Sequence, residues 1–132
     1  MSDIRGDLRY SQDHLWVRRD SGTSLVRVGI TDFAQDSLGD VLQVTLPELG
    51  DAVQAGQACG TIESAKSISD LFAPVTGTVR TRNDELARTP SLVNADPYGQ
   101  GWMLEVETGP ATLDRQLADL MDSDAYRDLV GA

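Results

Sequence analysis

Lys66 is the residue in this sequence whose type and position best suit covalent chemistry. It is the only lysine, and the other ten basic residues of the 132-residue chain are arginines. A lysine amine can be acylated, whereas an arginine guanidinium stays protonated and forms no stable amide in this way. A coding bias toward arginine explains the general loss of lysine, but not the position of the one that remains. We therefore interpret Lys66 as a lysine retained for chemistry.

The segment around Lys66 has the pattern of a β-hairpin. An apolar stretch leads into it, and a second one leads out through Ala73-Pro74. Between them lie small and polar residues, namely Ser64, Ala65, Ser67 and Ser69. This pattern predicts a hairpin with Lys66 at or near its tip. An exposed lysine on a rigid turn with small neighbours suits an enzyme that attaches a cofactor. A Schiff-base lysine would instead need a desolvated pocket to lower its pKa.

The elements that must position this hairpin are mostly short strands. We predict strands over 15–19, 25–30, 41–46, 57–63, 71–73, 75–81 and 102–107, separated by glycine and proline residues. Between the second and third strands, 31–39 has a hydroxyl N-cap, an acidic first turn and a terminal glycine, which predicts a short helix. The segment 90–99 should form a long ordered loop with at most one helical turn.

After Pro110 the apolar period changes to that of a helix. Leu113, Leu117, Leu120 and Met121 are spaced to form one apolar stripe, and Ser123 is the expected N-cap of a last short helix. In that helix the inward-facing residues should be Tyr126, Leu129 and Val130. The C-terminal helical segment is thus expected at about 111–130, and the whole chain, 1–132, as a single domain. The predicted class is mainly β, a sandwich with peripheral helices.

The composition excludes several other functions. The net charge of −10 argues against nucleic-acid or anionic-membrane surfaces and favours basic protein partners. The single cysteine, Cys59, excludes an internal disulfide, and one histidine cannot assemble a histidine-rich metal site, so we expect no metal. With no signal-like apolar run or membrane-length segment, a cytoplasmic location is expected.

The sequence resembles the glycine cleavage H proteins from about Asp13 to Trp102. The motifs that match, in order and at compatible spacing, are Val28-Gly29-Ile30-Thr31-Asp32-Phe33-Ala34-Gln35, Leu38-Gly39-Asp40, Glu63-Ser64-Ala65-Lys66, Ser69-Asp70, Ala73-Pro74-Val75-Thr76-Gly77 and Leu92-Val93-Asn94-Ala95-Asp96-Pro97-Tyr98-Gly99. The resemblance implies a flattened β sandwich, the barrel-sandwich hybrid of biotinyl and lipoyl carriers. It also implies lipoate bound covalently to Lys66 as N6-lipoyllysine, in a cofactor-binding segment that includes Glu63, Ser64, Ala65 and Ser67.

The resemblance further implies a carrier without catalytic turnover of its own. In such a carrier, the arm formed by the lysine and its lipoyl group accepts an aminomethyl group from glycine decarboxylase (P protein), the pyridoxal-phosphate enzyme. It presents the group to the tetrahydrofolate-dependent aminomethyltransferase (T protein) and is reoxidised by the flavin enzyme dihydrolipoyl dehydrogenase (L protein). Lipoate-attaching enzymes are the remaining implied partners. The reactive sulfurs belong to the cofactor, and the protein supplies position and protection.

One family feature is absent. The family commonly reads His-Glu-Trp where this chain has His14-Leu15-Trp16, and by resemblance that glutamate lines the cleft that receives the arm. Leu15 cannot provide a carboxylate, so Asp13 and Asp70 are the candidates to supply the charge. His14 belongs to the same candidate arm cleft, although a surface or packing histidine without a chemical role is the more common case.

Other functions remain open at this stage. The chain could be a lipoyl domain of a 2-oxoacid dehydrogenase acyltransferase, or an H-like protein that relays lipoyl groups to such enzymes. Its length, its C-terminal helices and the lack of a Pro/Ala-rich linker disfavour the first. Biotin carriers usually place the modified lysine between two methionines, unlike Ala65 and Ser67. An unmodified binding module, or a small enzyme that uses Asp13 and Asp70, is a further alternative, although no Ser-His-Asp motif or phosphate-binding loop is present.

Overall fold

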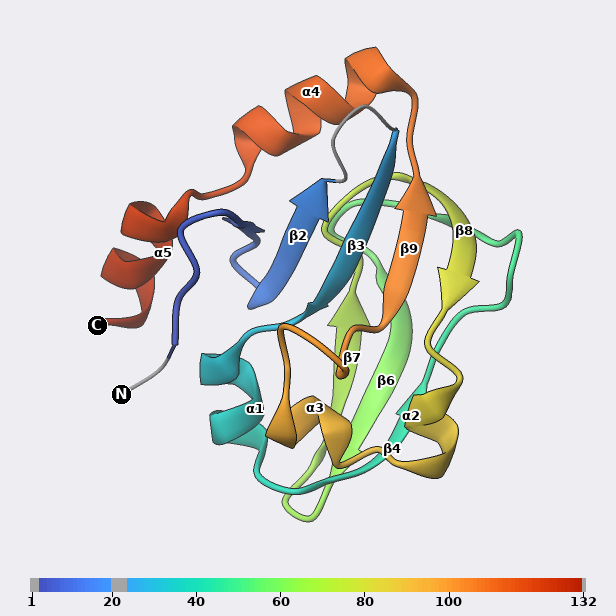
Figure 1. The fold of residues 1–132 in the computed structure, drawn as a ribbon, viewed down its shortest axis with the longest axis vertical. Helices are drawn as coiled ribbons and strands as arrows, with labels where there is room; N and C mark the ends of the chain where they lie inside the picture. Colours follow the sequence, from blue (N-terminus) through green and yellow to red (C-terminus); the bar gives the residue numbers. More distant parts are fainter. Residues whose placement is uncertain (1–2, 20–23, 132) are drawn as a thin grey trace.

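The computed structural model describes residues 3–19 and 24–131, and it consists of two antiparallel β-sheets with helices at their edges (Figure 1). The larger sheet has the strand order β1 (Arg9–Tyr10), β2 (Leu15–Arg19), β3 (Leu25–Ile30), β9 (Leu104–Glu107), β8 (Gly77–Arg82) and β5 (Ala52–Val53). The smaller sheet has the order β4 (Val41–Thr45), β6 (Ala58–Ser64) and β7 (Ile68–Phe72). The predicted mainly β sandwich of the carrier type is confirmed.

The core lies where the inward faces of the two sheets meet. Alternation along β3 buries Val26 and Val28, while β6 and β7 contribute Ile62 and Leu71 from the opposite side. Side chains of a strand point alternately to its two faces, so each of these strands offers one apolar face to the core. Burial of this apolar surface stabilises the sandwich and fixes the register of β6 and β7, the two strands that lead to and from Lys66.

Within the described residues, five short helices lie around the sheets. They are α1 (Asp32–Leu38), α2 (Glu85–Arg88), α3 (Leu92–Ala95), α4 (Pro110–Asp119) and α5 (Ser123–Val130). Helix α1 begins as predicted: the Thr31 hydroxyl accepts a hydrogen bond from the Ala34 N–H, and Gly39 ends the helix at φ 77°. The expected loop at 90–99 contains the single turn α3, whereas α2 and the two-residue strands β1 and β5 were not predicted.

The C-terminal helices are present, but some details of the prediction were wrong. Helix α4 ends at Asp119, and Met121 instead forms a β-bridge with Tyr10. Asp122 rather than Ser123 caps α5, because its carboxylate accepts the Ala125 N–H. Leu129 is 50% exposed and does not face inward. The helical spacing of apolar residues in the sequence continues past Asp119, but the β-bridge of Met121 ends the helix there.

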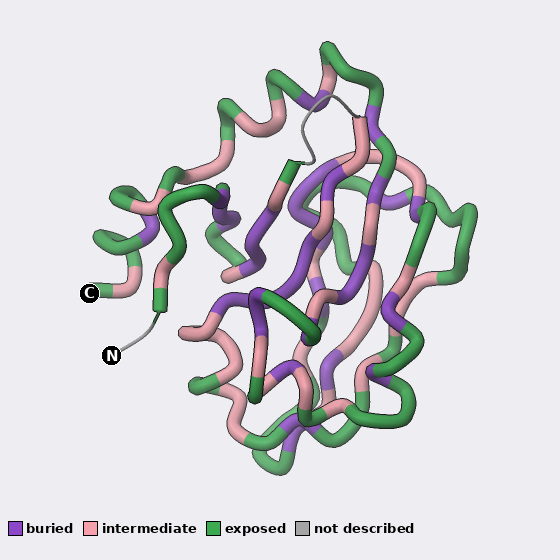
Figure 2. Tube along the Cα trace, viewed as in Figure 1, coloured by how far each residue is buried: buried purple, intermediate pink, exposed green. Residues whose placement is uncertain are grey.

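Helix α5 packs on the N-terminal segment rather than on the middle of a sheet. Tyr126 is buried and stacks on Tyr10 of β1, with ring centroids 4.5 Å apart. Trp16, Tyr98 and Leu8 complete this second apolar cluster. Figure 2 shows the buried stretch at this point of α5, and both chain ends lie on that side of the molecule. The C-terminal helix and the start of the chain therefore support each other next to β2.

Candidate functional site

The turn between β6 and β7 is a tight hairpin tip made of Ala65 and Lys66. The N–H of Ser64 donates to the carbonyl of Ser67 at 2.8 Å, which closes the turn. The buried Ser64 hydroxyl accepts hydrogen bonds from the N–H groups of Lys66 and Ser67, both at 3.2 Å, and can donate to the Ser67 carbonyl. A serine here satisfies backbone groups that a two-residue turn leaves without partners. The turn is consequently fixed by its own first residue.

Lys66 itself is exposed. The turn between β6 and β7 lies at the free end of the smaller sheet (Figure 1). The alkyl stem of Lys66 passes over Gly39, where a Cβ added to the glycine would lie 3.4 Å from Cε of the lysine. The tip also rests on the chain after α1, because the Ala65 N–H donates to the carbonyl of Asp40 at 3.1 Å. The lysine amine is thus presented to solvent while its stem and backbone are supported.

Next to the hairpin, a cavity of about 250 Å³ opens between α1 and the edge strand β7. Its walls are mainly apolar, formed by Leu15, Ile30, Phe33, Ala34, Leu38, Ile62 and Leu71. Polar groups line the remainder, contributed by Asp13, His14, Ser37, Ser69 and Asp70. The cavity can therefore take a slender apolar group and place a polar end against carboxylates.

All three predicted cleft residues, Asp13, His14 and Asp70, line this one cavity. Asp13 and Asp70 are exposed, so their carboxylates stay solvated while reaching the cavity. Leu15, which replaces the family glutamate, also lines it and is only 3% exposed, within the main core. The end of the cavity near β2 is consequently more apolar than a glutamate would make it.

His14 is held by Tyr126, which the sequence placed on the inner face of the last helix but did not assign to the site. Its Nδ1 lies 2.8 Å from the hydroxyl of Tyr126, which also lies 2.7 Å from the hydroxyl of Thr31. His14 has φ 67°, the only positive φ outside glycine among the described residues. Burial lowers the pKa of His14, and the nearby Asp13 carboxylate opposes that shift. The imidazole is therefore favoured in its neutral form at the wall of the cavity.

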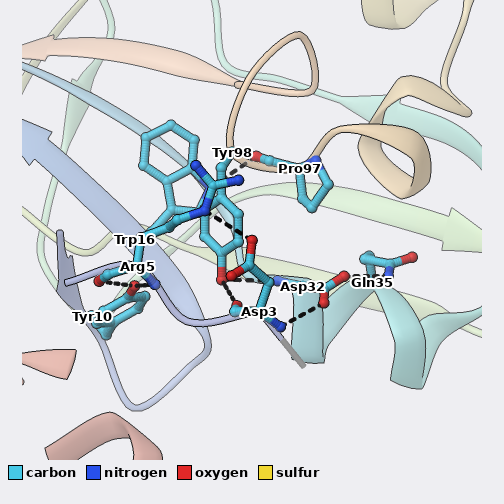
Figure 3. Close-up of polar contacts among 8 residues, drawn as sticks. All are labelled: Asp3, Arg5, Tyr10, Trp16, Asp32, Gln35, Pro97 and Tyr98. Carbon is cyan, nitrogen blue, oxygen red and sulfur yellow. Dashed lines mark hydrogen bonds and ion pairs between the residues drawn. The ribbon is translucent and has the colours of Figure 1, made fainter. Parts of the chain in front are cut away.

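The start of α1 is fixed by the N-terminal segment (Figure 3). The Asp3 N–H donates to the Asp32 carboxylate at 2.8 Å, and Tyr98 donates to the Asp3 carbonyl. The Arg5 guanidinium lies 4.9 Å from the centre of the Tyr98 ring. These contacts join the chain start, α1 and the 97–98 segment into one support for the cavity wall.

The remaining predicted site residues fall into two groups. Ser64 and Ala65 belong to the closed turn described above, and Ser67 is exposed beside Lys66. Glu63 lies one residue before the turn, paired with Gln43 of β4 and Ile68 of β7, and is half-buried. It lies near Lys66 in the chain but does not line the cavity.

A lysine at the tip of a closed hairpin, on a sandwich of two sheets and beside an apolar cleft, is the arrangement typical of a carrier domain. Comparison with known proteins narrows the class. Residues 8–132 match the family model described as glycine cleavage H-protein. Glycine cleavage system H proteins of Mycobacterium avium and Mycobacterium tuberculosis are 55% and 52% identical, each over 96% of both chains. A crystal structure of a glycine cleavage system H protein from Mycobacterium marinum superposes with a TM-score of 0.86 at 38% identity, covering 98% of this chain and all of that one. The chain belongs to the glycine cleavage H-protein family.

Within the part of the chain that the structure describes, no helix is long and apolar enough to cross a membrane.

Proposed function

We propose that this protein carries lipoate as an amide on Nζ of Lys66 and shuttles the aminomethyl group of glycine within the glycine cleavage system, in the cytoplasm. As a member of the H-protein family, it is a lipoyl carrier of that system. The observation that most supports Lys66 is its exposure at a turn that Ser64 holds closed. The proposed partners are the P, T and L proteins and the lipoate-attaching enzymes. The whole chain acts as one carrier domain without turnover of its own.

The site fits a lipoyl group in two respects. The amine of Lys66 is accessible to an attaching enzyme, and the adjacent cavity is apolar and about 250 Å³ in volume. When bound, lipoate supplies two redox-active sulfurs that take up and release the aminomethyl group. Tethering at the hairpin gives each partner a high local concentration of that cofactor.

The residues of the cavity have distinct tasks in this proposal. The apolar side chains of Leu15, Phe33 and Leu38 exclude water from the end of the arm. An ammonium drawn into such a place needs a nearby negative charge, or its burial becomes unfavourable. Asp70 provides that charge with help from Asp13, because both line the same cavity. The two aspartates thus take over the task of the absent family glutamate.

The attachment site is tested by intact mass after co-expression with a lipoate ligase. The wild type should gain one lipoyl group, and Lys66→Arg should gain none. Ser67→Ala, which changes a neighbouring exposed residue and keeps the lysine, is the matched control and should stay modified. Amide formation removes one positive charge, so the net charge should change from −10 to −11. A mass gain in Lys66→Arg would refute the assignment.

The carrier role is tested with the decarboxylase. The lipoylated protein should restore glycine-dependent exchange of carbon dioxide to the P protein, and the unmodified protein should not. If the exchange fails with a competent decarboxylase, while lipoyl groups pass to 2-oxoacid dehydrogenase subunits, the relay function would replace this proposal.

The charge in the cavity is tested with Asp70→Asn and Asp13→Asn. Lipoylation should survive, but the loaded protein should release its aminomethyl group faster, by about tenfold if one charge-assisted hydrogen bond is lost. Asp36→Asn is the control, because Asp36 is exposed on α1 and does not line the cavity. Unchanged lifetimes in both cavity variants would reject the role of the aspartates. A longer lifetime in Leu15→Glu would show that the cleft can still use the family arrangement.

A further inference from the structure

Asn94 on α3 connects three separate segments next to the lysine hairpin. Its Oδ1 accepts the N–H of Val41 at 2.9 Å. Its Nδ2 donates to the carbonyl of Gly39 at 2.9 Å and to Oε1 of Gln35 at 3.1 Å. These partners lie 53 to 59 residues away in the chain. One half-buried side chain thus joins the end of α1, the start of β4 and α3.

The chemistry of these contacts requires a carboxamide. A backbone N–H can only donate and a backbone carbonyl can only accept, so the side chain must offer an acceptor to Val41 and a donor to Gly39. Aspartate has the same shape, but when ionised it has no donor. Gln35 continues the connection, because its Nε2 donates to the Asp32 carboxylate at 2.7 Å. Figure 3 shows this pair beside the contact between Asp32 and Asp3.

The residues that Asn94 fixes are those on which the hairpin tip rests. Asp40 lies between its two backbone partners, and the Asp40 carbonyl accepts the Ala65 N–H. Gly39 lies under the stem of Lys66. A shift of the 39–41 backbone would therefore move the support of both tip residues, whereas the Ser64 contacts within the turn would persist.

We propose that Asn94 is a positioning residue for Lys66, which holds residues 39–41 so that the hairpin tip is presented in one place to the enzymes that attach lipoate. This inference rests on the proposed function for its consequence in lipoylation. The physical part, restraint of the tip, stands separately and is measurable in the unmodified protein.

Asn83 provides a matched control for this residue. Its side chain also donates two hydrogen bonds, in this case both to backbone carbonyls, those of Gln100 and Trp102 at 2.8 Å, and it accepts one from the Glu85 N–H. Those partners lie outside the 39–41 segment and the hairpin. Asn83→Asp and Asn94→Asp therefore remove the same number of donors, and only the second acts on the tip.

The experiment compares the full-length wild type with these two variants. Both should melt at lower temperature than the wild type. Only Asn94→Asp should speed hydrogen exchange of the Ala65 amide, measured by NMR, and only this variant should lower kcat/KM for lipoylation by a lipoate ligase, each by about tenfold, the change expected from roughly one lost hydrogen bond. Asn94→Ala and Asn83→Ala repeat the comparison without a new charge, in case an aspartate variant fails to fold.

Equal Ala65 exchange and equal lipoylation kinetics in the two variants of a pair would overturn the proposal. If the wild type itself were not lipoylated at Lys66, the proposed function would fail, and the exchange of Ala65 would still decide the role of Asn94. Slower lipoylation of Asn94→Asp without faster exchange of the Ala65 amide would also contradict the positioning role of Asn94, because the restraint of the hairpin tip would then be intact.

Discussion

Removing the hydroxyl of Tyr126 should loosen the cavity wall without affecting lipoylation. The side chain is fully buried, and its hydroxyl contacts Nδ1 of His14 and the hydroxyl of Thr31. Tyr126→Phe keeps the stacking on Tyr10 but leaves both polar partners with one contact fewer. A buried polar group without its partner costs about 1–3 kcal/mol, so stability should fall by about that amount. For a chain of this size, each kcal/mol lowers the melting temperature by roughly 4 °C.

Tyr10→Phe is the matched control for this change. Tyr10 is the other ring of the same stack, and its hydroxyl contacts the backbone N–H and carbonyl of Arg5, at 2.7 and 2.6 Å. Both variants should therefore lose comparable stability. Because Arg5 lies away from the cavity lining, only Tyr126→Phe should change the surroundings of His14.

The assay combines thermal melting, NMR of His14 and the lifetime of the loaded protein. His14 is the only histidine, so its ring signals are unambiguous. Tyr126→Phe should shift or broaden these signals and shorten the lifetime of the loaded protein, while intact mass shows normal lipoylation. If the two variants affect His14 and the lifetime equally, or if neither does, the idea that α5 supports the cavity through Tyr126 is wrong.

Three further predictions concern individual residues. Burial lowers the pKa of His14 from 6.5, so between the lowered value and 6.5 the unfolded chain binds more protons than the folded one. The free energy of unfolding should therefore fall as the pH decreases through that window. Urea unfolding at pH 7.5 and 5.5 should show a smaller decrease in His14→Asn than in the wild type, and asparagine tolerates the positive φ of this position. Gly39 has φ 77° and ψ −159°, a conformation nearly restricted to glycine, so Gly39→Ala should lower the free energy of unfolding by about 1–3 kcal/mol. It should also change the hydrogen exchange of the Ala65 amide. The control Gly50→Ala, at a glycine of positive φ with open space at its Cβ, should leave that exchange unchanged. Burial raises the pKa of Cys59 to about 11, so alkylation at pH 8 should be roughly a hundredfold slower than in urea, and equal rates would contradict the burial of this thiol.

The parts of the fold that could be predicted from sequence are those with a local signal. The strand β3 shows apolar alternation, β2 begins with a run of three apolar residues, and both have the predicted bounds. Helix α1 has its own cap residue and terminal glycine. The strands β1 and β5 have two residues each, too few for any period to show. Met121 continues a helical spacing, but its pairing with Tyr10 ends the helix, and no local pattern reveals a partner 111 positions earlier.

The candidate site divides in the same way. The hairpin was predictable because Ser64, Lys66 and their neighbours interact within four residues of sequence. Asn94 and Tyr126 gave no comparable signal, since an asparagine in a loop and a tyrosine on an amphipathic helix have ordinary roles in most proteins. Their importance appears only when residues 53 and 112 positions away become neighbours.

The lysine tip and the cavity have separate supports that meet in one helix. The tip depends on Ser64 within the turn and on Asn94 below it, whereas the cavity depends on His14 and Tyr126. The two supports share α1, since Gln35 in the middle of the helix contacts Asn94, and the N-cap residue Thr31 contacts Tyr126. Changes confined to α5 should therefore act on protection of the arm, and changes confined to α3 on attachment of the arm. A variant that lost both functions together, with the sheets intact, would place its defect in α1.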